Sequence, residues 1–347
     1  MIERVYFHNV AEREKRDGLP GVRLHRFPAS VRHALSENGR TRAVLSNGCE
    51  IRFTTDAKHV RVTLSALETN GKVMVLRGDF VHSVHTLQAG TMQTLHLETP
   101  ERFAEVGREA LCNRAFSPDV WRIYMDRFCA VFHDIDAFGH EVRPPEKREM
   151  PEITLLAYGS SITQGAGAQS HYNGYVQQAA RRLQIDALNL GLSGSCLCEK
   201  EVADFIAERN DWDVAFFELG VNMRSLFTAE EFRQRAEYLL DTVIDRHREK
   251  PVFVTTIYPN RATYFRNPND VLSERERQYN DVLRRYVANK NHPHLHLIEG
   301  SEIMTDFTSL TSDLIHPSDY GHILMGEHLA RHLRPVVDKL RGSAGDR

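Results

Sequence analysis

The chain has 347 residues, of which 41% are hydrophobic and 26% charged, and its formal net charge is −3. This length allows more than one hydrophobic core, and the composition is typical of a globular protein. The small negative charge gives no reason to expect nucleic acid or an anionic membrane surface as a partner.

The first residues are rich in charge and lack the apolar run that a secretory signal requires. No apolar stretch of the sequence is long enough to span a bilayer. The five cysteines are an odd and sparse set, which is typical of reduced thiols. We therefore expect a cytoplasmic protein with no membrane partner.

Residues 20–142 alternate between apolar and polar in short runs that are separated by turn residues. The alternation predicts strands at 50–56, 59–67, 72–81, 94–98, 120–125 and 129–139, with a short helix near 101–111. Many short strands at this spacing are typical of a β-sandwich or jelly roll.

The segment 143–152 contains three prolines and several charged residues, which indicates a linker. We place the domain boundary near residue 148. The prediction is a β-sandwich accessory domain over 1–148, a second domain over 149–340 and a disordered tail over 341–347.

Strands and amphipathic helices alternate in the second domain. The predicted strands are 153–158, 186–193, 213–220, 251–259 and 294–300, and the predicted helices are 173–183, 199–209, 229–248, 273–290 and 321–340. Strict alternation indicates a doubly wound α/β fold, in which five parallel strands have helices on both faces. Ligands of such sheets bind outside the carboxyl ends of the strands.

Polar and glycine-rich blocks follow these strands. They contain Gly159, Ser160 and Ser161 after the first strand, Gly191 to Ser195 after the second, Gly220 and Asn222 after the third, and Asp313, His316 and His322 ahead of the last helix. Acyl transfer needs such a set, because a serine hydroxyl attacks well only when a histidine removes its proton and a carboxylate orients that histidine. Backbone N–H groups of glycine turns and an asparagine amide stabilise the oxyanion.

Four of these blocks resemble the motifs of the SGNH/GDSL hydrolase family, in order: GSSIT (159–163), SGS (193–195), GVNM (220–223) and DLIH (313–316). The resemblance covers about the last 200 residues of the chain and implies a flavodoxin-like fold and esterase or acylhydrolase activity. It implies a catalytic triad and an oxyanion hole. The triad is Ser161 as nucleophile, His316 as base and Asp313 as the acid that orients it, and the hole is made by Ser161, Gly194 and Asn222.

Two positions depart from the family pattern. Ser160 stands where the family usually has Asp, and it brings no charge. Met223 stands where an Asp often follows the oxyanion asparagine, so Asn222 needs support from elsewhere. These changes bear on rate and substrate more than on the class of reaction.

A β-sandwich ahead of such a domain is similar to the layout of some carbohydrate esterases. The sequence therefore predicts a serine esterase that removes short acyl groups, chiefly acetyl, from an acylated saccharide, without a cofactor. Two alternatives stay open: a lipid-ester or thioester acylhydrolase, and a carbohydrate-binding protein with a degenerate catalytic half. A homo-oligomer also stays open.

Three further residues near the strand ends are candidates for substrate binding: Glu218, Arg224 and Tyr258. Each also has a structural interpretation. Glu218 suits a buried or paired carboxylate, and Arg224 suits an ordinary ion pair.

Two other groups suggest a metal or redox site. His292, His294 and His296 alternate along one predicted strand, which would suit zinc, but they fit a solvated strand end better. Cys196 and Cys198 lack a second pair at zinc spacing, so small core-filling thiols are the preferred interpretation. We predict no metal site.

Overall fold

The chain forms two separate hydrophobic cores. The computed structural model describes residues 4–112, 115–267 and 269–345. One compact unit contains the chain up to Ala29 together with Ala43–Glu152, and the other contains Ser30–Arg42 together with the chain from Ile153 onward.

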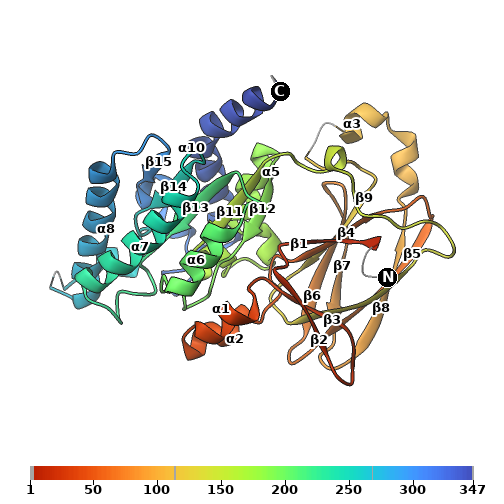
Figure 1. Cartoon of the computed structure of the whole chain (residues 1–347), viewed down its shortest axis with the longest axis horizontal. Coiled ribbons are helices and arrows are strands. Elements are labelled where there is room, and N and C mark those ends of the chain that lie inside the picture. The colour runs from red at the N-terminus through yellow and green to blue at the C-terminus, as the bar shows by residue number, and fades with distance from the viewer. Residues whose placement is uncertain (1–3, 113–114, 268, 346–347) are drawn as a thin grey trace. The chain divides into compact units, whose positions relative to one another are not determined.

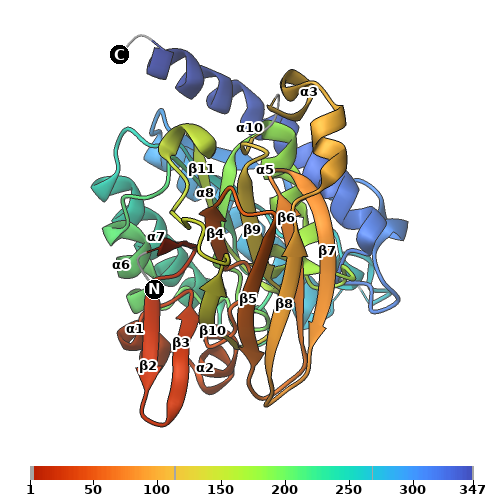
Figure 2. The ribbon, with the colours of Figure 1, turned by 90° about the vertical axis from the view of Figure 1, so that its right-hand side faces the viewer.

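The first unit consists of two five-stranded antiparallel sheets. In order across the first sheet the strands are β1 (Tyr6–His8), β4 (Glu50–Thr54), β9 (Val120–Met125), β6 (Gly71–Arg77) and β7 (Phe80–Leu87). Across the second sheet they are β2 (Glu12–Arg16), β3 (Leu19–His25), β10 (Ala130–Asp136), β5 (His59–Ala66) and β8 (Met92–Glu98). Figure 2 shows the strands of this unit. Side chains from both sheets, such as Phe53, Trp121 and Phe132, share one core.

The elements before residue 153 differ from the prediction at three points. The predicted strand 72–81 covers all of β6 except Gly71 and the first two residues of β7, because the chain turns at Gly78 and Asp79. Strands β1 to β3 precede the predicted ones, and the short helices α1 (Ala29–Ala34) and α2 (Glu37–Ala43) follow them. In place of the one short helix predicted near 101–111, β8 is followed by the 3-10 helix η2 (Glu101–Glu105) and helix α3 (Arg108–Cys112), and η3 (Lys147–Glu149) lies in the predicted linker.

The second unit has one parallel sheet, as predicted. Its strands in spatial order are β12 (Asp186–Asn189), β11 (Thr154–Tyr158), β13 (Val214–Glu218), β14 (Val252–Thr255) and β15 (Leu295–Ile298), all parallel. This is the 2-1-3-4-5 order of the flavodoxin-like fold. Near-continuous burial along each strand is what a sheet covered on both faces requires.

Helices cover the sheet (Figure 1). They are α4 (Ser161–Gln164), α5 (Tyr175–Leu183), α6 (Lys200–Glu208), α7 (Ala229–Arg246), α8 (Val271–Lys290), α9 (Gly300–Ile303) and α10 (Asp319–Gly345), with 3-10 helices η4 (His171–Asn173), η5 (Arg261–Tyr264) and η6 (Phe307–Ser309). Helices α5 and α10 pack together over one core, while α6 packs on α7 and α7 on α8.

The unit boundaries differ from the predicted domain ranges at two points. Residues 30–42 belong to the second unit although they lie within the first predicted domain. Residues 341–345, predicted to be part of a disordered tail, continue α10, and 346–347 lie outside the described residues. Within the described ranges, no helix combines the length and apolar character that crossing a membrane requires.

Candidate active site

Ser161 lies where β11 gives way to α4, at the carboxyl edge of the sheet. Its neighbour Ser160 has extended backbone and caps the short helix, because the Ser160 hydroxyl accepts the N–H of Ile162 at 3.1 Å. A serine at this cap position therefore fixes the direction in which the chain leaves the strand. Ser161 itself is only 6% exposed.

Glu218, at the end of β13, supports this turn. The parallel register pairs Tyr158 with Phe217, so the residues after Tyr158 pass beside Glu218. Oε2 of Glu218 accepts the Ser160 N–H at 2.7 Å, the Ser160 hydroxyl at 2.6 Å and the Thr163 hydroxyl at 3.0 Å. Burial raises the pKa of Glu218, and these hydrogen bonds partly offset the effect.

Asp313 organises the loop that carries His316. One carboxylate oxygen, Oδ1, accepts the N–H of Ile315 at 2.8 Å, the N–H of His316 at 3.0 Å and the Thr311 hydroxyl at 2.8 Å. The other, Oδ2, lies 2.6 Å from Nδ1 of His316. Partial burial raises the pKa of Asp313, but the hydrogen bonds from His316, Ile315 and Thr311 outweigh it and hold the pKa well below its usual range.

A close approach of two loops holds His316 in place. Gly167 has φ +99°, and a Cβ atom there would lie 2.0 Å from the carbonyl oxygen of Pro317. Only glycine permits this contact. On the other side, the N–H of Arg261 donates to the carbonyl of Leu314, which has φ +58°.

These loops join three side chains in one hydrogen-bonded series. Oγ of Ser161 lies 2.7 Å from Nε2 of His316, whose Nδ1 meets the Asp313 carboxylate. Since the ionised carboxylate only accepts, the imidazole carries its proton on Nδ1, which leaves Nε2 to accept from the serine. The geometry therefore suits removal of the Ser161 proton by His316.

Three N–H donors have no acceptor in the described part of the chain: the backbone N–H groups of Ser161 and Gly194 and the side-chain amide nitrogen of Asn222. Gly194 has φ +65°, a conformation that favours glycine. Oδ1 of Asn222 accepts the N–H of Cys196 at 3.1 Å, which orients the amide and leaves its NH₂ available. This bond supplies the support that Met223, fully buried, does not give.

Asn38 on α2 contacts the glycine-rich loop, residues 191–195, and the sequence analysis did not predict this contact. Its Nδ2 donates to Oγ of Ser195 at 2.7 Å and to the carbonyl of Gly194 at 3.2 Å. No local signal marks this residue, because its place depends on residues 30–42 packing in the second unit.

The three residues predicted to bind substrate lie in the interior instead. Glu218 is 2% exposed and holds Ser160. Arg224 is 7% exposed and binds Glu276 and the side chain of Asn260. Tyr258 is 2% exposed, and its hydroxyl donates to that of Tyr175 at 3.1 Å. All three side chains are thus buried and have partners within the second unit.

His322 is separate from the Ser161 series. It is fully buried, accepts the Tyr175 N–H on Nδ1 at 3.2 Å and therefore donates from Nε2 to the Ala166 carbonyl at 3.0 Å. Burial lowers the pKa of His322 to about 4. The histidine is thus held neutral and ties α10 to α5 and to the loop after α4.

Cys196 and Cys198 are both 2% exposed, and neither forms a disulfide, so both are buried thiols. Burial raises the pKa of Cys196 strongly. The three histidines of the β15 region, His292, His294 and His296, are all half-buried. In the ranges that the structure describes, no group of three or more His, Cys, Asp or Glu side chains is arranged to hold a metal ion.

The fold and this edge of the sheet define the class as a doubly wound α/β protein with its polar site at the carboxyl ends of the strands. Residues 152–334, more than half of the chain, match the GDSL-like Lipase/Acylhydrolase family. The chain belongs to that family, as its four motifs predict. No curated protein matches the chain.

Solved structures share the fold at low sequence identity. The salicylyl-acyltransferase SsfX3 from a tetracycline biosynthetic pathway is 15% identical with a TM-score of 0.78, covering 96% of this chain and 95% of its own. A family two carbohydrate esterase from Clostridium thermocellum, in complex with cellohexaose, is 15% identical with a TM-score of 0.63 over 84% and 93%. The acetyl xylan esterase Est2A from the rumen bacterium Butyrivibrio proteoclasticus is 13% identical with a TM-score of 0.56 over 84% and 90%.

Proposed function

We propose that the chain is a serine esterase that hydrolyses short acyl esters, in particular acetyl esters of a carbohydrate. The observation that carries the proposal is the series from Ser161 through His316 to Asp313, with distances of 2.7 and 2.6 Å. A hydroxyl, an imidazole and a carboxylate in this order are the parts that acyl transfer through an acyl-enzyme requires.

In the first half-reaction Oγ of Ser161 attacks the ester carbonyl carbon while Nε2 of His316 takes the hydroxyl proton. Asp313 stabilises the imidazolium that results. The backbone N–H groups of Ser161 and Gly194 and the amide of Asn222 donate to the oxyanion, and each such donor is worth about 3–4 kcal/mol in the barrier. The intermediate then expels the alcohol, which takes the proton from His316.

In the second half-reaction a water molecule attacks the acyl group on Ser161. His316 now takes a proton from the water and returns one to Oγ of Ser161 as the acid leaves. Atoms and charge balance with water as the only co-reactant, so the reaction calls for no cofactor.

A carbohydrate is the favoured alcohol part of the ester, because one similar structure is named as a family two carbohydrate esterase and another as an acetyl xylan esterase. The family itself supports acyl ester hydrolysis in general. Lipid-ester and thioester substrates, and a carbohydrate-binding protein without turnover, are the alternatives that the assay below separates.

Transfer of the acyl group to an alcohol rather than to water is a second candidate. SsfX3, which shares the fold over nearly the whole chain, is named as a salicylyl-acyltransferase. The first half-reaction is the same for both activities, and only the nucleophile that receives the acyl group differs. Product analysis with an added saccharide acceptor therefore decides between them.

The test follows release of a chromogenic alcohol from acetyl, butyryl and octanoyl esters, and of thiol from an acetyl thioester, by wild-type protein and by Ser161→Ala. We expect the acetyl ester to react fastest and the substitution to lower kcat on the order of 10⁴-fold or more, because the nucleophile is lost. With the acetyl ester, we expect mass spectrometry to detect an acyl-enzyme about 42 mass units heavier than the free protein, because an acetyl group replaces the hydroxyl hydrogen of Ser161.

Ser225→Ala is the matched control, because Ser225 is exposed and lies in the turn that follows Asn222. Unchanged turnover in Ser161→Ala would refute the nucleophile assignment. Faster reaction of octanoyl esters would favour a lipid-ester hydrolase, and no reaction with any acyl ester or thioester would favour the binding protein.

A further inference from the structure

A cavity of about 650 Å³ lies in the first unit, at the edges of its two sheets. Strand β7 is the edge of one sheet and β8 the edge of the other, and the hydrogen bond from the His82 ring to the Glu98 carbonyl at 3.0 Å joins them. Figure 2 shows these strands and the segment that follows β8, and residues 98–103 of this region line the cavity. The side chains that matter most are Arg77, Phe80, His82, Glu98, Arg102 and Phe103.

Arg77 carries a buried positive charge at this cavity. It is 5% exposed, and its guanidinium lies over the ring of buried Trp121, 4.8 Å from the centroid. It donates a hydrogen bond from Nη1 to the carbonyl of Asp119 at 2.6 Å, and its buried Nε has no acceptor among the residues that the structure describes. Burial lowers the pKa of Arg77 to about 10. A guanidinium offers five N–H donors, so most of its capacity is unused.

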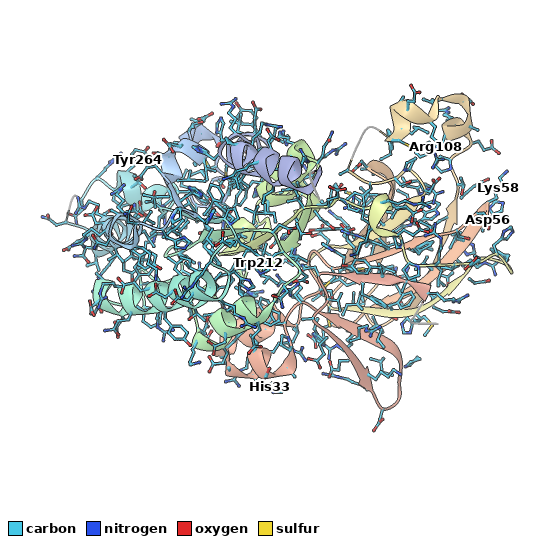
Figure 3. All side chains as sticks on the ribbon, turned by 45° about the horizontal axis from the view of Figure 1, so that its top comes forward. His33, Asp56, Lys58, Arg108, Trp212 and Tyr264 are labelled. Carbon is cyan, nitrogen blue, oxygen red and sulfur yellow. The ribbon has the colours of Figure 1, made fainter. Side chains whose placement is uncertain are left out.

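No carboxylate of the described residues forms an ion pair with Arg77, because the nearby acids have other partners. The carboxylate of Asp119 binds Arg108, and Glu98 and Glu101 both pair with Lys58, at 3.5 and 2.9 Å. Figure 3 labels Arg108 and Lys58 on this unit. The Asp119 carboxylate attracts Arg77 only through its charge, without a direct ion pair, and buried charges are normally paired directly, so the Arg77 guanidinium can take a further anionic partner.

Aromatic side chains that are partly open to solvent also line the cavity. Phe80 is 39% exposed and meets half-buried Phe103 edge to face, with 5.3 Å between ring centroids. Val81, 51% exposed, extends this apolar surface. A concave apolar wall with a few directed polar groups is the usual form of a small-molecule site.

We propose that this cavity binds a carboxylate carried on a six-membered ring, as in a sugar acid or an aromatic acid. The planar fork of Arg77 matches a carboxylate, and the rings of Phe80 and Phe103 cover the body of the ligand. Glu98 and Glu101 at the rim disfavour a doubly charged anion such as phosphate. This site lies outside the Ser161 series and does not depend on the proposed esterase activity.

The test titrates full-length protein with sodium D-glucuronate, sodium benzoate, D-glucose and sodium phosphate at constant ionic strength. Binding is followed by calorimetry and, in a Trp212→Phe background, by the fluorescence of Trp121, the remaining tryptophan. We expect at least one carboxylate to give a saturable signal, with glucose and phosphate at least tenfold weaker. The two carboxylates distinguish a sugar acid from an aromatic acid.

Arg77→Met is expected to weaken carboxylate binding at least tenfold. Arg61→Met is the matched control, because Arg61 also lies over an aromatic ring of this unit, that of Phe138, at 4.6 Å. Phe103→Ala tests the aromatic wall independently and should weaken binding at least threefold, and it serves alone if Arg77→Met does not fold.

Failure of both carboxylates to bind wild-type protein would overturn the proposal, as would equal binding of glucose or phosphate. Full binding by a folded Arg77→Met variant would overturn the role of the guanidinium. Full binding by Phe103→Ala would overturn the aromatic wall.

Discussion

At the scale of single residues, Ser160 shows how the chain replaces a charge that its family usually places beside the nucleophile. The hydroxyl of Ser160 donates to Glu218 at 2.6 Å, so the carboxylate comes from the neighbouring strand. The same Glu218 oxygen also binds the Ser160 N–H and the Thr163 hydroxyl. The negative charge is thus one hydrogen bond further from Ser161 and fully buried.

Glu218→Gln tests this replacement. The amide has nearly the same shape but no charge, and hydrogen bonds to a charged group contribute about 1.5–3 kcal/mol each, more than neutral ones. We expect kcat on an acetyl ester to fall about 10- to 100-fold while KM changes little, because the turn that presents Ser161 loosens. Steady-state kinetics at constant pH measures the split between the two constants.

The control for this substitution is Glu276→Gln, which alters another buried carboxylate of the same unit, the partner of Arg224. Both variants should lose stability in urea, but only Glu218→Gln should lose turnover beyond the loss of folded protein. Equal kcat in the two variants would mean that Glu218 supports the fold without positioning the serine.

Asp313→Asn tests the orientation of His316. The side-chain oxygen of asparagine can still accept the N–H groups of Ile315 and His316, but its NH₂ group faces Nδ1 and disfavours the proton there. We expect kcat to fall about 10²- to 10⁴-fold with the loop intact, because His316 takes the wrong tautomer. Kinetics and a crystal structure of the variant measure the two parts of this expectation.

Asp306→Asn provides the comparison, since Asp306 also caps its own turn by accepting the N–H of Thr308 at 2.8 Å and its hydroxyl at 2.7 Å. Its activity should stay within twofold of wild type. A similar loss in both variants would attribute the effect of Asp313 to capping alone.

At the scale of elements, the helices and strands of the second unit follow from periodicity, whereas the contacts of residues 30–42 do not. Apolar spacing identifies α5, α7 and α10 because each buries a continuous face. Helices α1 and α2 have six and seven residues, too few for a clear period. Their membership of the second unit is a tertiary property that no local pattern encodes.

The candidate site divides in the same way. The side chains of the Ser161 series stand in local motifs at strand ends, so the parallel topology predicts that they meet. The partner of Ser160 depends on the register between β11 and β13, which pairs Tyr158 with Phe217. Single-sequence patterns place strands but not their register, so the sequence left open whether Glu218 faces the site or is a buried, paired carboxylate.

Asn38→Ala tests whether α2 contributes to the site. Loss of the bonds to Ser195 and to the Gly194 carbonyl frees the glycine-rich loop and weakens alignment of the Gly194 N–H. We expect kcat/KM on an acetyl ester to fall about tenfold, equivalent to about 1.4 kcal/mol, which is typical for one hydrogen bond. Unfolding in urea should change by less than about 1 kcal/mol, since Asn38 is exposed.

Glu37→Ala, on the same helix and also exposed, is the control. Its kcat/KM should match that of wild type. If Asn38→Ala retains full activity, residues 30–42 pack in the second unit without influencing the glycine-rich loop, residues 191–195.

At the scale of the whole molecule, each unit has its own core and its own buried tryptophan. The chain has two tryptophans, Trp121 in the first unit and Trp212, labelled in Figure 3, in the second. Both are 1% exposed or less. Single-tryptophan variants therefore report the unfolding of each unit separately, which a two-unit chain requires because one midpoint does not describe two transitions.

Acid should weaken the second unit through His322. Its pKa is about 4 in the folded chain, against 6.5 for an ordinary histidine, so the unfolded chain binds the proton first as the pH falls. The free energy of unfolding therefore decreases between about pH 6.5 and pH 4, by an amount on the order of 3 kcal/mol, and is unaffected by this group above that range. Urea titrations of Trp121→Phe protein, followed by Trp212 fluorescence, measure this change.

His322→Gln, in the same Trp121→Phe background, isolates the contribution, because glutamine has an acceptor and a donor but does not titrate. We expect this variant to be less stable than its parent at pH 7, since the stacking of His322 on Tyr175 is lost. The difference should shrink or reverse by pH 4, where holding His322 neutral lowers the free energy of unfolding of the parent.

His33→Gln, on the exposed face of α1, is the matched control for the same unit. A constant difference between His322→Gln and its parent from pH 7 to pH 4 would show that His322 has the same pKa in the folded and the unfolded chain. In that case the folded chain would bind the proton near pH 6.5, and the hydrogen bond from Tyr175 N–H to Nδ1 would not keep the ring neutral below that pH.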